Sequence, residues 1–293
     1  MLRSTLSHLT LVPNDIPDSG AKASARTGRI WIRLRKEAEE AVVREPMLAR
    51  LFFDSIINQP TLEEAVAHRI GSRLHNDVLP SSAITYVLRT AMAADKSIGE
   101  AMRADIRAAV ERDPACDRFI EPFLYYKGFH AIQTQRLAHW LWNNNGRDFA
   151  LYLQSRSSDV FQTDIHPAAS FGRGIFLDHA TGLVVGATAV VEDDVSLLQN
   201  VTLGGTGKEA GDRHPKVRRG AVIGAGAKIL GNIEIGAEAR VAAGSVVLRR
   251  VAPSTTVAGV PARQVAAAKP GDSPHEIDQL LNAMSVEALT YSI

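Results

Sequence analysis

The sequence predicts an α+β fold in which an all-α N-terminal region precedes a left-handed parallel β-helix with one protruding loop. Two observations support this class. In the first half, apolar residues recur at helical spacing, and in the second half an aliphatic residue recurs every six positions. We therefore divide the chain into an N-terminal extension (1–28), a helical domain (29–163), a β-helix domain (164–265) and a C-terminal tail (266–293).

Capping signals and apolar spacing predict the elements of the first half. Thr61 with Glu64, and Ser97 with Glu100, each have the form of a capping box, which marks the start of a helix. Two prolines indicate a break between 113 and 123. The apolar spacing predicts helices over 31–46, 82–94, 97–112, 128–143 and 147–160.

The six-residue period of the second half indicates a parallel β-helix. Three hexads make one triangular coil of about eighteen residues, and equivalent positions stack about 4.8 Å apart. The period slips once by two residues, between Leu177 and Val185. The aliphatic heads of the hexads, which we expect to point inward, are Ile165, Phe171, Leu177, Val185, Val191, Leu197, Leu203, Ile223, Ile229, Ile235, Val241 and Val247.

One segment, 203–220, interrupts the period with the sequence LGGTGKEAGDRHPKVRRG. It is polar, glycine-rich and basic, so we expect it to leave the β-helix as a loop. Loops of this length in an otherwise regular fold often carry function.

Charge, hydropathy and cysteine usage exclude several classes of protein. The net charge of +1 gives no basic surface for nucleic acid, and no apolar run is long enough to span a membrane. The single cysteine, Cys116, excludes an internal disulfide framework and indicates a reducing compartment, so we expect a cytoplasmic location. Residues 1–28 lack a signal-peptide core and are expected to be a flexible extension, with an organelle transit peptide as the alternative.

Several charged or imidazole side chains interrupt the otherwise bland repeat. An Asp beside a His is the orienting half of a general-base pair, because the carboxylate fixes the imidazole tautomer and stabilises the imidazolium. His179 follows Asp164 by fifteen residues, three short of a full coil, so we expect the two side chains near each other but not stacked. The candidate residues are Asp164, His166, Asp178, His179, Arg213 and His214.

Some of these candidates have a competing interpretation. His166 precedes Pro167, so capping of a coil corner is its alternative role. Zinc held between chains by three His is a second alternative, but no zinc ligand set stands out and we predict no metal. Arg213 and His214 lie in the only long loop, where Arg is the usual fork for a carboxylate and a solvated charge is the competing interpretation.

Several motifs together resemble one known family. The stretches DIHPAA, LDHATG, VTLGGTG, DRHPK, IGAGAKILGN, GSVV and AGVPAR resemble the serine O-acetyltransferases of bacterial cysteine synthesis. The helical segments EPML, DPA and LYYKGFHAIQ…HWLW are similar to the same family, so the resemblance covers about residues 30–265.

The resemblance implies transfer of acetyl from acetyl-CoA to the hydroxyl of L-serine. It assigns His179 as the general base and Asp164 as its partner. It also implies that other residues bind serine through its ammonium, its carboxylate or the substrate site, namely Asp113, Asp178, Arg213 and His214.

The resemblance also implies where acetyl-CoA, a co-substrate rather than a permanent cofactor, would lie. It would run along the coils between neighbouring chains, passing the small residues Gly205, Ala225 and Gly244. Arg240 stands where we expect Lys, and either cation would meet the phosphates. Family members form trimers that pair through their helical domains into hexamers, which implies an oligomerisation role for 29–163 and a catalytic role for 164–265.

Two further partners follow from the resemblance. L-Cysteine is expected to inhibit by occupying the serine site, because it differs from serine only in thiol for hydroxyl. The chain ends in Ile293, as family members do when the tail binds O-acetylserine sulfhydrylase, although the rest of the tail departs from the usual pattern. Two alternatives stay open: a hexapeptide acyltransferase for a sugar or antibiotic hydroxyl, and a non-enzymatic scaffold that docks the sulfhydrylase.

Overall fold

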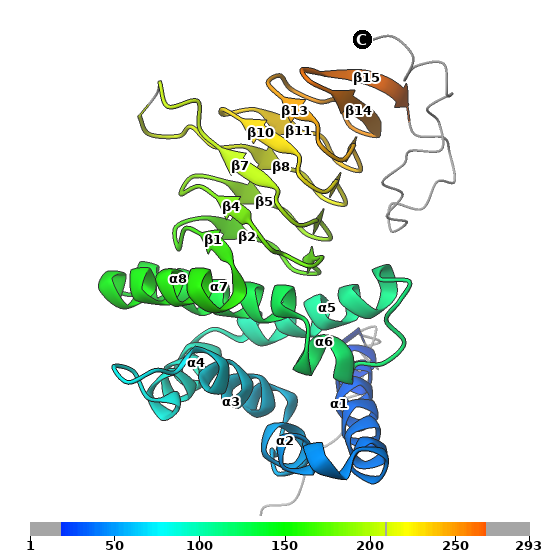
Figure 1. The fold of residues 1–293 in the computed structure, drawn as a ribbon, viewed down its shortest axis with the longest axis vertical. Coiled ribbons are helices and arrows are strands. Elements are labelled where there is room, and N and C mark those ends of the chain that lie inside the picture. The colour runs from blue at the N-terminus through cyan, green and yellow to red at the C-terminus, as the bar shows by residue number, and fades with distance from the viewer. Residues whose placement is uncertain (1–18, 209, 268–293) are drawn as a thin grey trace, which may run out of the picture.

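The computed structural model describes residues 19–208 and 210–267, in which a block of helices is followed by a parallel β-helix (Figure 1). The helices come first along the chain, and the coils of the β-helix stack on α7 and α8. The α-helices are α1 (Ser19–Arg44), α2 (Ala49–Phe52), α3 (Leu62–Leu74), α4 (Ser81–Ala94), α5 (Lys96–Arg112), α6 (Ile120–Leu124), α7 (Lys127–Asn143) and α8 (Arg147–Phe161). A 3-10 turn, η1 (Pro46–Leu48), and a π-helical turn, η2 (Phe53–Ile57), flank α2.

The predicted helices are confirmed, with two corrections at their starts. Thr61 does cap α3, since its Oγ1 accepts the Glu64 N–H at 3.3 Å. Ser97 does not cap α5: Asp95 is the N-cap, and its Oδ1 accepts the Ser97 N–H at 2.9 Å. The expected extension 1–28 is also wrong in part, because α1 begins at Ser19.

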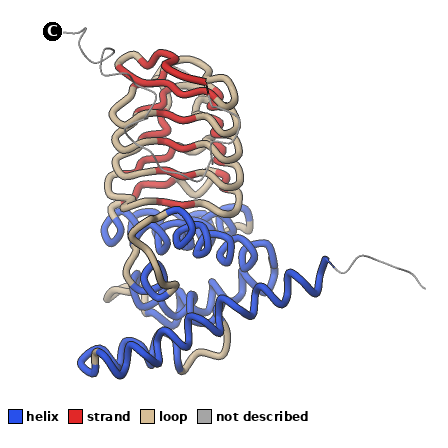
Figure 2. Tube along the Cα trace, turned by 90° about the vertical axis from the view of Figure 1, so that its right-hand side faces the viewer, coloured by secondary structure: helices blue, strands red, loops and turns tan. Residues whose placement is uncertain are grey.

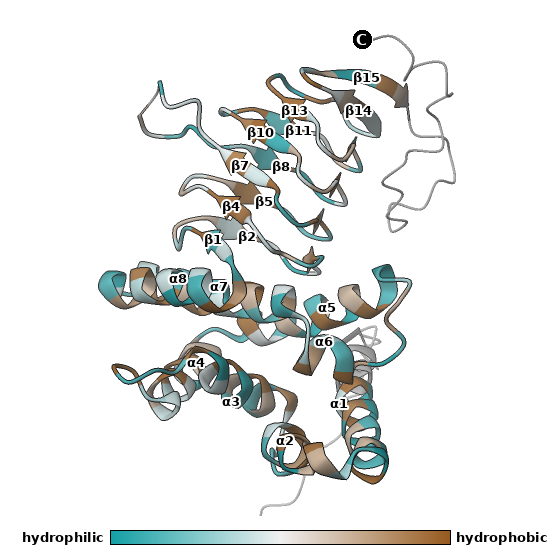
Figure 3. Cartoon of the chain, viewed as in Figure 1, coloured by the Kyte–Doolittle hydropathy of each residue, from teal (hydrophilic) through white to brown (hydrophobic). Residues whose placement is uncertain are grey.

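Amphipathic helices build the first half. Polar and apolar residues are mixed along the helices (Figure 3), and apolar side chains such as Leu34, Ile70, Leu88 and Ile106 form one shared core. The exception is α7, which buries polar as well as apolar side chains. This core continues without a break into the interior of the β-helix. The helical region therefore packs directly on the first coil and is not a separate domain joined to it by a linker.

Three parallel sheets form the β-helix, and their strands stand in columns one coil above another (Figure 2). Sheet A contains β1 (Thr163–Ile165), β4 (Leu183–Val185), β7 (Thr202–Gly204), β10 (Lys228–Leu230) and β13 (Val246–Val247). Sheet B contains β2 (Ser170–Phe171), β5 (Val190–Val191), β8 (Lys216–Val217) and β11 (Glu234–Ile235). Sheet C contains β3 (Phe176–Leu177), β6 (Ser196–Leu197), β9 (Val222–Ile223), β12 (Arg240–Val241), β14 (Thr255–Gly259) and β15 (Ala262–Ala267), the last antiparallel to β14.

The aliphatic heads fill the interior as predicted. Eleven of the twelve are buried, and Phe171 is half-buried where α7 approaches the first coil.

Two edges of this prism carry candidate site residues. The CA edge joins sheet C to sheet A and contains 178–182, 198–201, 224–227 and 242–245. The AB edge joins sheet A to sheet B and contains 166–169, 186–189, 205–215 and 231–233.

The protruding loop is shorter than expected. The interruption 203–220 keeps β7 and β8 inside the coil, so only 205–215 leaves it (Figure 1). Val217 is a buried head that pairs with Val191 and with Ile235. In the sequence, Val217 lies between the charged residues Lys216 and Arg218, so it looks like part of the polar loop. Both neighbours point out of the sheet, while Val217 points inward.

Candidate active site

The two-residue slip in the repeat is a tight turn that displays His179. Thr163 pairs with Leu183, twenty residues later, against about eighteen for a regular coil. His179 and Ala180 both adopt left-handed backbone angles, with φ of +53° and +59°, a conformation that side chains other than Gly seldom adopt. The His179 side chain is 74% exposed. The extra residues therefore carry an imidazole outside the regular CA edge.

Both the helical region and the second coil hold this turn. The Gly182 N–H donates to the Gln162 carbonyl at 2.8 Å, and the Asn200 N–H donates to the Thr181 carbonyl at 2.6 Å. Lys127, at the start of α7, donates from Nζ to Gln162 Oε1 at 3.2 Å and also to Thr181 Oγ1. The unusual backbone is therefore fixed from two sides.

A cavity of about 620 Å³ opens beside the turn, between the helices and the first coil. We call it the His179 cavity. Asp113, Asp178 and His179 line it together, although Asp113 follows α5 and the other two follow β3. The structure therefore brings together three of the six residues predicted for catalysis and serine binding.

The electrostatics of this cavity favour a cation beside a base. Burial raises the pKa of Asp178, the His179 imidazole opposes that rise, and the charge of Asp113 adds to it. His179 Nε2 lies 3.8 Å from Asp178 Oδ1, which is too long for a hydrogen bond. Two carboxylates gain from a bound ammonium that relieves their repulsion, and an exposed imidazole beside them can serve as a base for a bound hydroxyl.

A buried ion pair fixes the helices on the β-helix. Asp105 on α5 accepts from Arg136 Nε and from the Ile175 N–H, both at 2.9 Å. Arg136 on α7 also donates to the Gly172 carbonyl at 2.7 Å. Because both charged side chains are buried and fully engaged with each other and with the coil, the two halves of the cavity wall keep one relative position.

Asp164, the predicted partner of His179, makes a different contact. Its side chain projects from the exposed face of β1, where Oδ1 accepts from Gln154 Nε2 at 2.6 Å. Asp164 and His179 form no ion pair in this structure, and the carboxylate nearest to the imidazole is that of Asp178. The catalytic partnership of Asp164 therefore stays a prediction.

Arg213 and His214 lie on the AB edge, away from the His179 cavity. His214 is buried, and its Nδ1 lies 2.8 Å from Thr188 Oγ1. Gly205, predicted to line the acetyl-CoA path, packs against the Arg213 stem, since a Cβ there would lie 3.1 Å from Arg213 Cδ. In one chain, Arg213 and His214 thus lie on the AB edge, while Asp113 and Asp178 line the His179 cavity.

His166 has the structural role that was its alternative interpretation. Its Nδ1 accepts the Ala168 N–H at 3.0 Å, which closes the first corner of the AB edge. Its ring also packs edge-on against Trp142, with ring centroids 5.1 Å apart. Burial lowers the pKa of His166, although Asp164 opposes this shift. These contacts give His166 a structural role at this corner.

Two of the residues predicted to line acetyl-CoA continue the edge that carries His179. Ala225 and Gly244 lie on the CA edge one coil apart, joined by a hydrogen bond from the Gly244 N–H to the Ala225 carbonyl at 2.8 Å. A Cβ at Gly244 would meet no atom within 4 Å, so the space beside it is open. Arg240 lies on β12 of sheet C, next to this edge.

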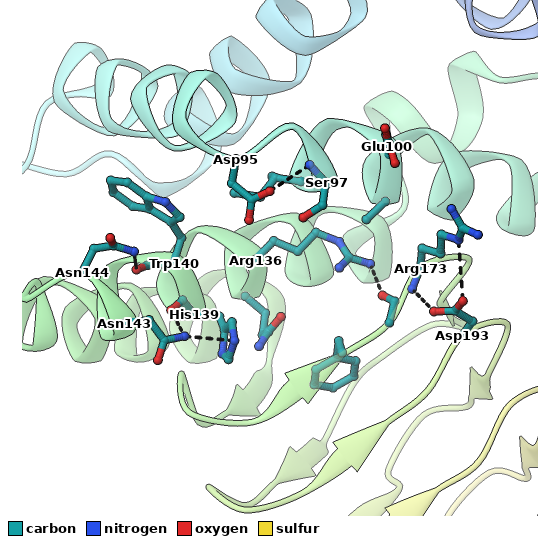
Figure 4. Close-up of a pocket in the computed structure, with 15 residues that line it drawn as sticks. Asp95, Ser97, Glu100, Arg136, His139, Trp140, Asn143, Asn144, Arg173 and Asp193 are labelled. Atoms are coloured by element: carbon teal, nitrogen blue, oxygen red, sulfur yellow. Dashed lines mark hydrogen bonds and ion pairs between the residues drawn. The ribbon is translucent and has the colours of Figure 1, made fainter. Parts of the chain in front are cut away.

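A second cavity of about 460 Å³ lies where α5 and α7 meet the first coil (Figure 4). It contains none of the residues predicted for the site. Arg136 and His139 enter it from α7, and Arg173 pairs with Asp193 at its rim. These polar groups are engaged with neighbours in the protein: His139 Nδ1, for example, donates to the Pro167 carbonyl at 2.8 Å.

Within residues 19–208 and 210–267, none of the helices is long and apolar enough to cross a membrane. The same part of the chain contains no group of three or more His, Cys, Asp or Glu side chains arranged to hold a metal ion.

Sequence reasoning missed the residues that support the site. Lys127 contacts Thr181 in the turn that displays His179, and Thr188 contacts His214, but each is an ordinary helix or coil residue by pattern. Gly128 is a third: a Cβ there would lie 1.9 Å from the Leu177 carbonyl oxygen, so only Gly lets α7 approach β3. A glycine inside a helical pattern was the one available signal.

Comparison with known proteins identifies the family. Residues 30–134 match the family model described as serine acetyltransferase, N-terminal, and residues 214–249 match the bacterial transferase hexapeptide model. A serine acetyltransferase of Salmonella typhimurium is 52% identical over 257 residues, which covers 87% of this chain and 93% of the relative. The chain belongs to the serine acetyltransferase family.

Solved structures of serine acetyltransferases share the fold. The enzyme from Brucella abortus in complex with coenzyme A is 56% identical, with a TM-score of 0.83 over 84% of this chain and 98% of that one. A serine acetyltransferase in complex with cysteine is 49% identical, with a TM-score of 0.84 over 86% of this chain and 98% of the other. The predicted helical region and hexapeptide β-helix are therefore those of serine acetyltransferases.

Proposed function

We propose that this chain transfers acetyl from acetyl-CoA to the hydroxyl of L-serine, giving O-acetyl-L-serine and CoA, the first step of cysteine biosynthesis from serine. The observation that carries the proposal is the His179 cavity, where two carboxylates lie beside an exposed imidazole. Relatives with 52% and 56% sequence identity are named serine acetyltransferases, and the second has a solved structure in complex with coenzyme A.

His179 acts as the general base in this proposal. It takes the proton of the serine hydroxyl as that oxygen attacks the acetyl carbonyl carbon of acetyl-CoA. The resulting tetrahedral intermediate breaks its C–S bond, and the imidazolium gives the serine proton to the leaving CoA sulfur. A carboxylate that stabilises the imidazolium accelerates this step, and Asp164 is the residue proposed for it.

Asp113 and Asp178 hold the serine ammonium in this proposal, while Arg213 and His214 serve its carboxylate and the substrate site. An α-amino acid carries these two charges a few ångströms apart, so both pairs must meet at one site. One chain supplies Asp113, Asp178 and His179 around its His179 cavity, and the AB edge of a second chain supplies Arg213 and His214. A homotrimer packed around the β-helices achieves this pairing at each interface.

Acetyl-CoA runs along the CA edge in this arrangement. The open space beside Gly244 and the small side chain of Ala225 leave room for its pantetheine arm above His179. Arg240 lies next to this edge and suits the phosphates. Gly205 contributes indirectly, because its missing side chain makes room for Arg213. No permanently bound cofactor takes part.

Pairing of two trimers through the helical region completes the proposed assembly. Apolar side chains are exposed at the end of α1 and in the turn after it, with Met47 94% exposed and Val43 80% exposed. Leu48 and Phe53 extend this patch. Contiguous exposed apolar side chains mark interaction surfaces in folded proteins, which supports the hexamer.

L-Cysteine is the proposed inhibitor and acts at the serine site. It presents the same ammonium and carboxylate to Asp113, Asp178 and Arg213, and its thiol takes the place of the hydroxyl. A serine acetyltransferase solved in complex with cysteine supports this proposal.

A partnership with O-acetylserine sulfhydrylase through Ile293 is also part of the proposal, and 268–293 lie outside the described residues. Deletion of Ile293 should abolish a complex with the sulfhydrylase in size-exclusion chromatography and leave acetyl transfer unchanged. A complex that survives the deletion would refute the role of Ile293.

The single, buried and unpaired Cys116 supports the proposed cytoplasmic location.

Release of the CoA thiol, followed with and without L-serine, tests the central proposal. Serine-dependent release should fall by about 100- to 10,000-fold in His179→Ala, because a general base contributes that much. Added L-cysteine should raise the apparent KM for serine. Sugar acetylation without any serine activity would favour the alternative hexapeptide acyltransferase, and no transfer at all would favour the scaffold.

A further inference from the structure

Thr188 on the AB edge organises the backbone of the protruding loop. Its Oγ1 accepts the Arg213 N–H at 3.1 Å and the His214 N–H at 3.2 Å. A hydroxyl oxygen has two acceptor lone pairs, so these two bonds use both of them. The hydroxyl proton of Thr188 must therefore be donated to another atom.

Two side-chain acceptors are available to it: Nδ1 of His214, which lies 2.8 Å from Thr188 Oγ1, and the Asp212 carboxylate. The Thr188 backbone N–H donates to the same His214 nitrogen at 3.2 Å. A nitrogen that accepts from a backbone N–H holds no proton of its own, whichever acceptor the hydroxyl uses. The neutral His214 ring therefore has its proton on Nε2 and offers a single donor there.

Close packing keeps the ring in this position. A Cβ built on Gly186 would lie 2.0 Å from His214 Cδ2 and Nε2, so the ring lies directly against the Gly186 backbone. Lys216 donates from Nζ to the Thr188 carbonyl and to Asp212 Oδ1, both at 2.5 Å, which fixes the loop's return to the coil. The imidazole is thus fixed in position as well as in tautomer.

The charges around the ring act in the same direction. Burial lowers the pKa of His214, and the cations Arg213 and Lys216 and the nearby His166 lower it too. Asp212 is the one carboxylate that opposes them. Protonation would also place an N–H on Nδ1, facing the two donors of Thr188.

We propose that Thr188 is a positioning residue of the serine acetyltransferase site: it fixes His214 as a neutral donor through Nε2 and holds the Arg213 backbone beside it. The proposal rests on the proposed function, because it concerns the half-site that receives the serine carboxylate. His214 then acts as a hydrogen-bond donor rather than as a second base. The substrate group that it fits is an anionic oxygen.

Nitrogen-15 NMR of histidine-labelled trimer or hexamer tests the tautomer, with the His214 signal assigned by its loss in His214→Asn. In the wild-type protein at neutral pH, Nδ1 should show the chemical shift of an unprotonated nitrogen. This shift should persist to a pH below the pKa of a free imidazole. A protonated Nδ1 at neutral pH would overturn the proposal, whether or not the protein acetylates serine.

Kinetics of Thr188→Val and Thr188→Ser test the consequence for serine. Thr188→Val leaves two backbone donors without an acceptor, so the KM for L-serine should rise roughly tenfold or more, and the titration midpoint of His214 should move up. Thr188→Ser keeps the hydroxyl and should restore both values to within about twofold. Thr90→Val, whose hydroxyl donates only to the Tyr86 carbonyl on α4, is the matched control.

The outcomes separate the two proposals. An unchanged KM and an unchanged His214 titration in Thr188→Val would refute the role of Thr188 while leaving the acetyltransferase intact. Absence of serine activity in the wild type would refute the proposed function, and the NMR result would still decide the tautomer. If Thr188→Val fails to fold, the wild-type spectrum and the kinetics of Thr188→Ser still test the role of Thr188.

Discussion

Arg112 Nη1 lies 3.1 Å from the carbonyl oxygen of Asp194, which ties the last turn of α5 to the second coil of the β-helix. The same guanidinium donates to Ser196 Oγ at 3.2 Å and pairs with the Asp194 carboxylate. Asp113 is the next residue along the chain. The position of this acid over Asp178 therefore depends on a contact between the two halves of the molecule.

Replacement of Arg112 should consequently misplace Asp113. In Arg112→Met, the buried groups of the second coil lose their donor, which should lower the free energy of unfolding by about 1–3 kcal/mol and raise the KM for L-serine. Denaturant titration and steady-state kinetics measure the two effects. Arg50→Met, at an ion pair whose Arg side chain is 93% exposed, should change neither. An unchanged KM in Arg112→Met would separate Asp113 from serine binding.

The carboxylate of Asp178 should lower the stability of the folded protein when no substrate is bound. Its folded-state pKa is raised, so the folded protein loses stability relative to the unfolded chain as the pH rises through that value. Asp178→Asn should therefore stabilise the protein by about 0.5–2 kcal/mol at pH 8, with the gain disappearing in acid. Thermal unfolding at several pH values measures this difference. A destabilised Asp178→Asn would mean that the carboxylate is satisfied inside the protein.

The same ionisation should set the pH dependence of serine binding. Asp178 must be charged to hold an ammonium, so the KM for L-serine should rise as the pH falls through the raised pKa of Asp178. This rise should begin above about pH 4, where an exposed carboxyl titrates. In Asp178→Asn, which should retain some activity, the KM for L-serine should not show this rise toward low pH, called here the acid limb. A limb that persists in the variant belongs to another group.

Gly128 should be essential for the contact between α7 and β3. A Cβ there would lie 1.9 Å from the Leu177 oxygen, so Gly128→Ala must push α7 away from the residue that precedes Asp178. We expect a loss of about 1–3 kcal/mol and weaker serine binding, measured by denaturation and kinetics. Gly28→Ala is the control: no atom lies within 4 Å of that Cβ, and helix propensity predicts a gain of about 0.5–1 kcal/mol.

The regular parts of the fold were predictable because a period of six leaves little freedom. Ile165, Leu197 and Ile235 could be assigned to the interior from spacing alone, and all are buried. Val217 could not, because the charged residues on either side of it belong to the outer face of the same strand. Capping was predictable at Thr61 but not at α5, since Asp95 and Ser97 are both competent caps two residues apart.

The site was predictable only in part, because its residues come from segments with different geometry. The slip before Val185 indicated an irregularity, and the structure places His179 on it. The meeting of Asp113 with Asp178 depends on how α5 packs on the β-helix, which no local pattern encodes. The pairing of Asp164 with His179 was predicted from their separation along the coil and from the family resemblance, and it stays a prediction; in the structure the Asp164 carboxylate accepts from Gln154.

The central claim is that each site is shared, with His179 from one chain and Arg213 from the next. Co-expression of His179→Ala with Arg213→Ala tests it most directly. If the site is shared, about one quarter of the interfaces in mixed trimers combine an intact His179 with an intact Arg213, so about one quarter of wild-type activity should return. His179→Ala mixed with Asp178→Ala, where both changes fall on the CA edge, should recover nothing. Recovery no greater than the sum of the two separate variants in the first mixture would contradict the shared site.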